Sequence, residues 1–125
     1  MVKKLNARQL EQYWKDGFAV IDRALPTSLL DKMLRLTDKI VEDAKGLTES
    51  NECYDLEETH SSHKPRLRRL KSPFKYWTLF NEFLRSDVDL SPVEQIIGHN
   101  VRLYNNKINM IKFIASRFYQ TLADT

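Results

Sequence analysis

The residue types best suited to binding a metal gather in one polar stretch of the chain. His60 and His63 stand close together, and Cys53, Glu57 and Glu58 precede them. Imidazole, thiolate and carboxylate groups are the ligands that zinc takes in proteins. The spacing is loose, however, no Cys-x-x-Cys pair is present, and the surrounding composition is typical of a flexible loop. We therefore predict no metal site among these residues.

A run of basic residues is the strongest polar feature of the sequence. Its members are Lys64, Arg66, Arg68, Arg69, Lys71 and Lys75. Side chains alternate between the faces of a strand, so Arg68 would face away from Arg69, whereas Leu67 and Lys71 would share the face of Arg69. Two interpretations stay open: a solvated edge that discourages strand pairing, or a site for carboxylate or phosphate, which a guanidinium can hold with two parallel hydrogen bonds.

No other catalytic constellation stands out. Asp87, Asp89 and Glu94 are close in sequence, but paired carboxylates need a cleft, and Glu94 is explained by helix capping. The glycines are isolated and predict helix ends rather than a phosphate-binding loop: Gly17, Gly46 and Gly98. We expect no catalytic residue.

Composition and charge are typical of one globular domain. The chain has 125 residues, of which 42% are hydrophobic and 30% are charged. The net charge of +3 is too small to demand a polyanionic partner, so nucleic acid is not expected. A single cysteine, Cys53, excludes an internal disulfide. No apolar run approaches the roughly 20 residues of a membrane span, and the N-terminus lacks the apolar core of a secretory signal. We predict a cytoplasmic protein without a membrane partner.

The first half of the chain predicts two helices and a short strand. Asn6 and Gln9 can form a capping box for a helix that ends at Gly17. Residues 18–22, FAVID, have the composition of a strand. A longer amphipathic helix is expected from Pro26 and Thr27 to about residue 44.

The second half predicts a loop, two strands and two helices. We expect an exposed loop over residues 47–64 and a strand at the edge of a sheet over 66–71. Ser72 and Pro73 would begin a third helix with an aromatic face.

A helix, a turn and a strand are expected between Ser91 and Met110. Ser91, Pro92 and Glu94 have the spacing of a helix start, and Gly98 that of its end. Residues 101–106 then alternate as in a half-buried strand.

These elements, in this order, resemble the N-terminal part of the phytanoyl-CoA dioxygenase family. The resemblance rests on DGFAVI at residues 16–21 and on VEQIIG at 93–98 followed by NVRL at 100–103. It covers residues 5–110.

The resemblance implies a fold and an activity. The fold would be α+β, mostly helices with a few short strands, forming the helical N-terminal portion of a double-stranded β-helix, also called a jelly roll or cupin-like fold. The activity would be that of an iron(II)- and 2-oxoglutarate-dependent dioxygenase, which hydroxylates a small organic or acyl substrate. Such enzymes hold iron with two histidines and one carboxylate.

The resemblance also suggests two residues that bind the cosubstrate. In relatives, a basic residue on the strand before the third helix helps to hold the 2-oxoglutarate carboxylate, and Arg69 corresponds to it best. Polar residues on the later strand, here Asn106 and Lys107, face the cosubstrate cavity. The alternative for Lys107 is a solvent-facing strand residue.

The chain departs from the family after Met110. There the family continues into a His-x-Asp pair, with a second histidine far downstream, and neither is present. Two explanations of residues 111–125 stay open. They form a short amphipathic helix, or they are encoded by unrelated sequence that follows a truncation or frameshift, and we favour the second. The domain would then be 1–110 with a divergent tail at 111–125. We expect such a chain to be inactive and to bind neither iron nor 2-oxoglutarate productively.

Three functions therefore compete. The chain is a portion of a dioxygenase, a small helical protein-interaction module without catalysis, or a weak binder of nucleic acid or another acidic partner through residues 64–75. Strands without partners would also leave edges through which the chain could self-associate.

Overall fold

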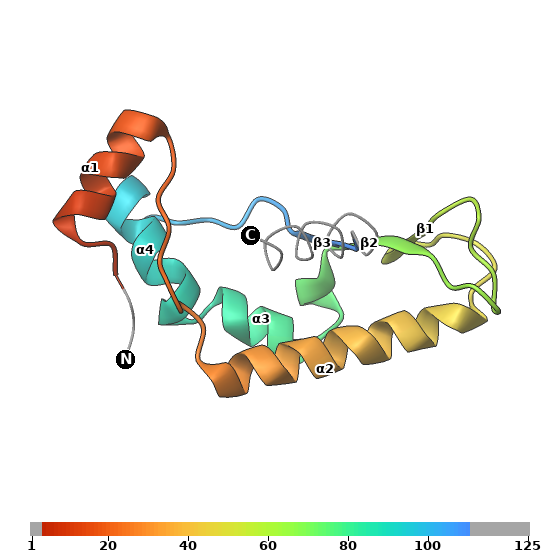
Figure 1. Ribbon diagram of the computed structural model, residues 1–125. Helices are drawn as coiled ribbons and strands as arrows, with labels where there is room; N and C mark the ends of the chain where they lie inside the picture. The colour runs from red at the N-terminus through yellow and green to blue at the C-terminus, as the bar shows by residue number, and fades with distance from the viewer. Residues whose placement is uncertain (1–3, 111–125) are drawn as a thin grey trace, which may run out of the picture. The chain divides into compact units, whose positions relative to one another are not determined.

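Helices and one small sheet make up the described chain, residues 4–110, which Figure 1 shows as a computed structural model. The helices are α1 (Ala7–Asp16), α2 (Thr27–Asp43), α3 (Thr78–Leu84) and α4 (Asp87–Ile97), with 3-10 turns η1 (Ala44–Gly46) and η2 (Pro73–Lys75). The strands are β1 (Tyr54–Leu56), β2 (Leu67–Lys71) and β3 (Lys107–Asn109). The mixture of helix and strand confirms the α+β prediction. The predicted tail, 111–125, lies outside the described residues.

The chain divides into two compact units. Residues 4–37 and 74–105 form the first unit, which contains α1, α3, α4 and the start of α2. Residues 38–73 and 106–110 form the second, which contains the end of α2 and the whole sheet.

The ends of α1 are those that the sequence predicts. The Asn6 side chain accepts a hydrogen bond from the Gln9 N–H at 2.9 Å, and the Gln9 side chain accepts one from the Asn6 N–H at 2.9 Å. Gly17 ends the helix in the left-handed conformation, with φ of 84°, and its N–H donates to the Tyr13 carbonyl. Glycine takes this conformation without the steric cost that a Cβ atom brings.

In the first unit, α1 and α4 lie side by side, as Figure 1 shows. Helix α4 also contacts the segment that precedes α1. The Gln95 amide makes two hydrogen bonds with the backbone of Leu5: it accepts from the N–H at 2.7 Å and donates to the carbonyl at 2.9 Å. The Leu5 side chain is buried. One side chain on α4 thus satisfies both backbone groups of a residue 90 positions away.

Two predicted elements in the first unit differ from the structure. Residues 18–22 form no strand, because no neighbouring strand pairs with them; the Val20 carbonyl accepts instead from the Gln9 side chain at 2.7 Å. The third helix does not start at Ser72. Ser72 has a left-handed φ of 50°, η2 follows, and Trp77 is extended before α3 begins.

Helix α4 begins earlier than predicted. Ser86, not Ser91, is its N-cap, and the Ser86 carbonyl accepts from the N–H groups of Asp89 and Leu90. Aspartates in the first turn suit the positive end of the helix dipole. Pro92 therefore lies inside the helix, where its missing N–H leaves one backbone hydrogen bond unmade. The Ser-Pro pair is a misleading signal because the preceding residues are already helical.

The sheet forms the centre of the second unit. It is antiparallel with the order β1-β2-β3, so β2 is the central strand and not the edge that the sequence predicts. The unit buries apolar side chains from α2, η1, the strands and the residue before β1: Ile40, Ala44, Cys53, Leu56, Leu67 and Leu70. The prediction of an exposed loop over 47–64 is wrong in part, because β1 lies within it.

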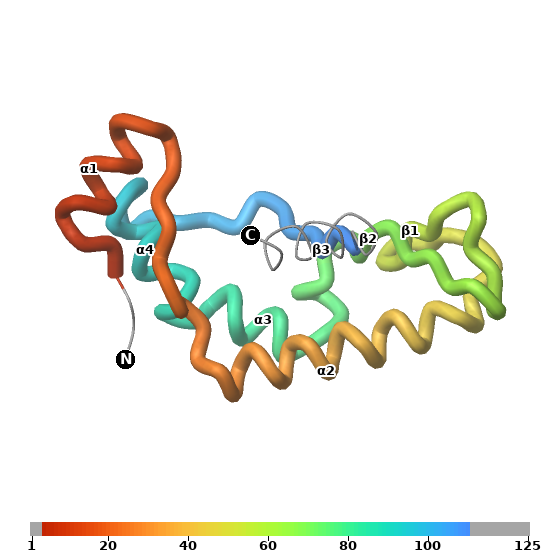
Figure 2. Tube along the Cα trace, viewed as in Figure 1, coloured from red at the N-terminus to blue at the C-terminus, as the bar shows by residue number. Residues whose placement is uncertain are grey.

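The last strand is displaced from its predicted position. Residues 101–106 are neither helix nor strand, and β3 is confined to residues 107–109. In Figure 2 the tube makes no helical coil between α4 and β3. Alternation of side chains does not make a strand without a partner. Of residues 101–110, only those around β3 pair with β2, whereas Tyr104 is fully exposed.

We expect Gln95→Leu to lower the free energy of unfolding by about 2 kcal/mol, because it leaves the N–H and carbonyl of Leu5 without their partner. Chemical denaturation followed by circular dichroism measures this. The matched control is Gln12→Leu, the same substitution at an exposed position of α1. Equal effects of the two substitutions would show that the Gln95 hydrogen bonds do not stabilise the fold.

Candidate functional site

The register of the sheet separates a polar face from an apolar one. Cross-strand partners share a face, and the partners include Asp55 with Arg69, Arg69 with Asn109, and Lys71 with Lys107. The polar face of the sheet therefore carries Asp55, Arg69, Lys71, Lys107 and Asn109. The apolar face carries Tyr54, Leu56, Leu67, Leu70 and Ile108.

An irregularity in β2 corrects the predicted faces of the basic run. Asp55 pairs with Arg69 and Leu56 with Leu67, so Arg68 is an extra residue without a partner on β1. This bulge turns Leu67 to the side of Leu70, and both are buried. The sequence predicted Leu67 on the face of Arg69, which is wrong. The prediction that Arg69 and Lys71 share a face agrees with the register.

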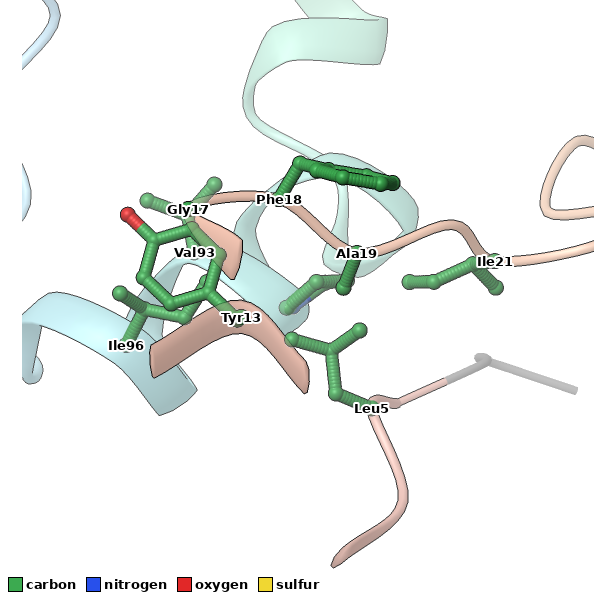
Figure 3. Close-up of a pocket in the computed structure, with 9 residues that line it drawn as sticks. Leu5, Tyr13, Gly17, Phe18, Ala19, Ile21, Val93 and Ile96 are labelled. Atoms are coloured by element: carbon green, nitrogen blue, oxygen red, sulfur yellow. The ribbon is translucent and has the colours of Figure 1, made fainter. Parts of the chain in front are cut away.

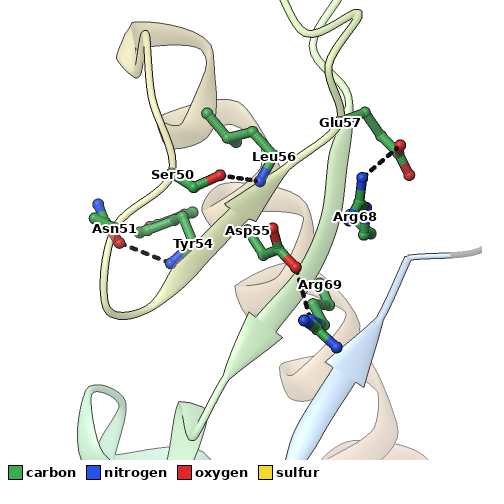
Figure 4. A network of polar contacts seen from close by, with 8 residues as sticks. All are labelled: Ser50, Asn51, Tyr54, Asp55, Leu56, Glu57, Arg68 and Arg69. Carbon is green, nitrogen blue, oxygen red and sulfur yellow. Dashed lines mark hydrogen bonds and ion pairs between the residues drawn. The ribbon is translucent and has the colours of Figure 1, made fainter.

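An ion pair fixes Arg69 on the polar face. Its Nε donates to an Asp55 carboxylate oxygen at 2.7 Å, as Figure 4 shows. The Asp55 side chain is 15% exposed and that of Arg69 is 41% exposed. A guanidinium has five N–H donors, and this contact uses the one on Nε. Arg69 is thereby oriented while donors remain for another anion.

Lys71 and Lys107 face one another without an acidic partner. They are direct neighbours on β2 and β3, and among residues 4–110 neither makes an ion pair. Like charges placed directly opposite in a sheet repel and destabilise it. An anion between the two ammonium groups would reverse the sign of this interaction. The pair is therefore the strongest electrostatic indication of a ligand site.

Cys53 lies beside the same strand but offers little reactivity. Burial raises the pKa of its thiol, and the nearby Lys71 ammonium offsets this rise in part. The Cys53 carbonyl accepts from the Lys71 N–H at 2.7 Å. A thiol with a raised pKa is a poor nucleophile at neutral pH.

His60 has a structural role. His60 Nδ1 accepts from the Arg66 N–H at 2.9 Å, and its Nε2 lies 3.0 Å from the Leu47 carbonyl. A neutral imidazole protonated on Nε2 satisfies both contacts, so neither nitrogen is available for a metal. Within the described part of the chain, no three His, Cys, Asp or Glu side chains are grouped to hold a metal ion. These residues do not fit the two histidines and carboxylate of an iron centre.

The structure places the predicted cosubstrate residues on the same sheet. Arg69 and Lys107 share the polar face, while Asn106 precedes β3 and its backbone carbonyl accepts from the Ser72 N–H. The side-chain oxygen of Asn106 is buried, and no donor in residues 4–110 reaches it. Sequence reasoning missed Asp55, which lay in a predicted loop, and the opposition of Lys71 and Lys107, which depends on the register of β3.

An apolar pocket is the second candidate site, and it lies within the first unit. It has a volume of about 330 Å³ and is lined by residues from α1, the following segment and α4, shown in Figure 3. The lining includes Tyr13, Phe18 and Ile96. Exposed apolar side chains occur on the same elements: Trp14, Phe18, Val20 and Ile97. No charged residue lines this pocket.

Comparison with known proteins finds a relative that is similar over part of its length. No protein-family model matches the chain. The sequence is similar to a Stutzerimonas stutzeri protein named "Probable alpha-ketoglutarate-dependent hypophosphite dioxygenase", with 28% identity over 103 residues. The similarity covers 82% of this chain and 36% of the relative, so the chain spans about a third of the relative's length.

This similarity points to the 2-oxoglutarate-dependent oxygenases in general, since alpha-ketoglutarate is 2-oxoglutarate. It does not single out the phytanoyl-CoA dioxygenase family. Separately, none of the helices within residues 4–110 is both long and apolar enough to cross a membrane.

A double-mutant cycle tests the Asp55–Arg69 ion pair. We expect Asp55→Asn and Arg69→Gln to show a coupling of about 1 kcal/mol or less in the free energy of unfolding, because solvent screens a partly exposed pair. The Glu57–Arg68 pair is the control, since it is longer at 3.4 Å and more exposed. Its coupling should be smaller. A larger coupling for the Glu57–Arg68 pair would contradict the conclusion that the Asp55–Arg69 ion pair fixes Arg69.

Proposed function

We propose that this chain is part of an iron(II)- and 2-oxoglutarate-dependent dioxygenase of the phytanoyl-CoA dioxygenase type. The similarity to the Stutzerimonas stutzeri protein supports the oxygenase group. The DGFAVI and VEQIIG passages support the phytanoyl-CoA type. On this proposal, the described residues belong to the helical portion and first strands of a jelly roll, and the whole enzyme hydroxylates a small organic or acyl substrate. The lone cysteine, Cys53, is a free thiol, which supports a reducing, cytoplasmic location.

The proposed role of this portion is to bind a carboxylate of 2-oxoglutarate on the polar face of the sheet. The observation that carries the proposal is that Lys71 and Lys107 oppose one another without an acidic partner among residues 4–110, next to an oriented Arg69. A carboxylate there would accept charge-assisted hydrogen bonds from both ammonium groups and from the remaining donors of Arg69. The Asp55 ion pair limits the entropy that Arg69 loses on binding, because the side chain is already held.

The described residues supply binding without the metal centre. Iron, when bound in such enzymes, supplies the redox chemistry, but the donor set of residues 4–110 does not fit it. The contribution of this portion is therefore to attract and orient the anionic cosubstrate. We expect the chain by itself to bind 2-oxoglutarate weakly and not to turn it over.

Titration of the full chain with 2-oxoglutarate, followed by calorimetry, tests the role of the polar face. We expect Lys107→Ala and Lys71→Ala each to weaken binding by about tenfold, since a charge-assisted hydrogen bond contributes about 1.5 kcal/mol or more. The matched control is Lys64→Ala, which removes the same charge from an exposed position outside the sheet. Equal weakening by all three variants, or no binding by the unmodified chain, would contradict the proposal.

An interaction module without catalysis is the second candidate function. It is favoured by the apolar pocket and by two exposed aromatic residues. Phe18, which lines the pocket, is 56% exposed, and Trp14, whose ring centroid lies 5.3 Å from that of the lining residue Tyr13, is 70% exposed. Large exposed apolar side chains that gather around a pocket are typical of a surface that binds another molecule. This function requires no anion on the sheet.

A neutral apolar dye tests the pocket. We expect Nile red fluorescence to rise on addition of the chain and the rise to be lost in Phe18→Ser, because Phe18 lines the pocket. Tyr104→Ser is the control, since it removes a fully exposed aromatic ring that does not line the pocket. If both variants bind the dye equally well, the pocket is not an apolar binding site.

A further inference from the structure

The two edges of the sheet differ in how their backbone groups are satisfied. In an antiparallel sheet, the N–H and carbonyl groups of every second residue on an edge strand point away from the neighbouring strand. These outward groups can pair with another chain. Here β1 forms one edge and β3 the other.

The β1 edge is closed by its own loop. The Tyr54 N–H donates to the Asn51 side chain at 2.8 Å, and the Asn51 N–H donates to the Tyr54 carbonyl at 2.9 Å. The Leu56 N–H donates to the Ser50 hydroxyl at 2.9 Å. Figure 4 shows Ser50 and Asn51 beside the outer side of β1. A further strand would have to displace these contacts.

Among residues 4–110, no segment covers the β3 edge. The Asn106 carbonyl accepts from the Ser72 N–H and the Met110 N–H donates to the Arg68 carbonyl, so the even-numbered residues bond to β2. By alternation, the backbone groups of Lys107 and Asn109 point outward. Within residues 4–110 no donor or acceptor pairs with these outward groups.

We propose that a second copy of this chain pairs along β3, antiparallel about a two-fold axis at Ile108. In this register Lys107 lies opposite the partner's Asn109, and Asn109 lies opposite the partner's Lys107. Each of these pairs exchanges two N–H···O bonds, so every outward backbone group of both strands is satisfied. This inference concerns the backbone edge and does not depend on the proposed oxygenase function.

Side-chain chemistry selects this register over its neighbours. A register centred on Lys107 would place two lysines directly opposite one another, which is unfavourable. The proposed register instead places an amide opposite each ammonium on the polar face. On the apolar face it brings Ile108, which is half-buried in one copy, against the partner's Ile108.

The edges also explain why assembly would stop at two copies. The contact is isologous, because the same strand is used by both partners. The combined sheet would end at both sides in β1, whose edge is closed. Pairing through β3 therefore yields a closed dimer rather than a fibre.

Sedimentation velocity of the full chain over a wide range of concentration tests the dimer. We expect a monomer–dimer equilibrium that Lys107→Pro abolishes, because proline lacks the outward N–H while leaving the bonds to β2 in place. Lys107→Ala is the matched control, since it keeps the N–H and should still dimerise. A concentration-independent monomer, or a Lys107→Pro variant that dimerises as well as Lys107→Ala, would overturn the proposal.

Cross-linking tests the register even where proline lowers stability. In a Cys53→Ala background, we expect Ile108→Cys to form a disulfide-linked dimer on mild oxidation, because directly opposed residues at this position have Cα atoms about 4.5 Å apart. Asn109→Cys should not, since it faces the partner's Lys107. Equal cross-linking of the two variants, or none by Ile108→Cys, would overturn the two-fold register.

Discussion

The pairing of β2 with a strand on each side is the interaction on which the second unit depends. It buries Leu67 and Leu70 on one face and brings three basic side chains together on the other. Neither neighbour of β2 is long, since β1 and β3 have three residues each. The site is therefore only as well defined as the register of these short strands.

Charge on the polar face is balanced in only one place. Asp55 neutralises Arg69, whereas Lys71 and Lys107 oppose each other without an acid among the described residues. A protein that keeps such a pair next to an oriented guanidinium loses some stability of the sheet. An anionic ligand would recover this stability, which is the physical basis of the proposed carboxylate-binding role.

The similarity to an oxygenase agrees with this role. It covers 82% of the chain, including most of both units, but only 36% of the relative. The described residues supply basic groups suited to a carboxylate, while their His, Cys, Asp and Glu side chains form no metal site. On the proposed function, this portion would bind the anionic cosubstrate, and the metal ligands would lie outside residues 4–110.

Sequence patterns were sufficient to predict the features that depend on neighbours within one helical turn. The capping box of Asn6 and Gln9, the end of α1 at Gly17 and the extent of α2 are local, and all agree with the structure. Ser91 is an exception. The sequence predicts it as the N-cap of a helix, but the residues before it are already helical and the N-cap of α4 is Ser86. The positions of the strands and the residues of the site depend on tertiary contacts. A strand exists only where a partner reaches it, so the bulge at Arg68, the ion pair of Asp55 and the meeting of Lys71 with Lys107 required the pairing of distant segments.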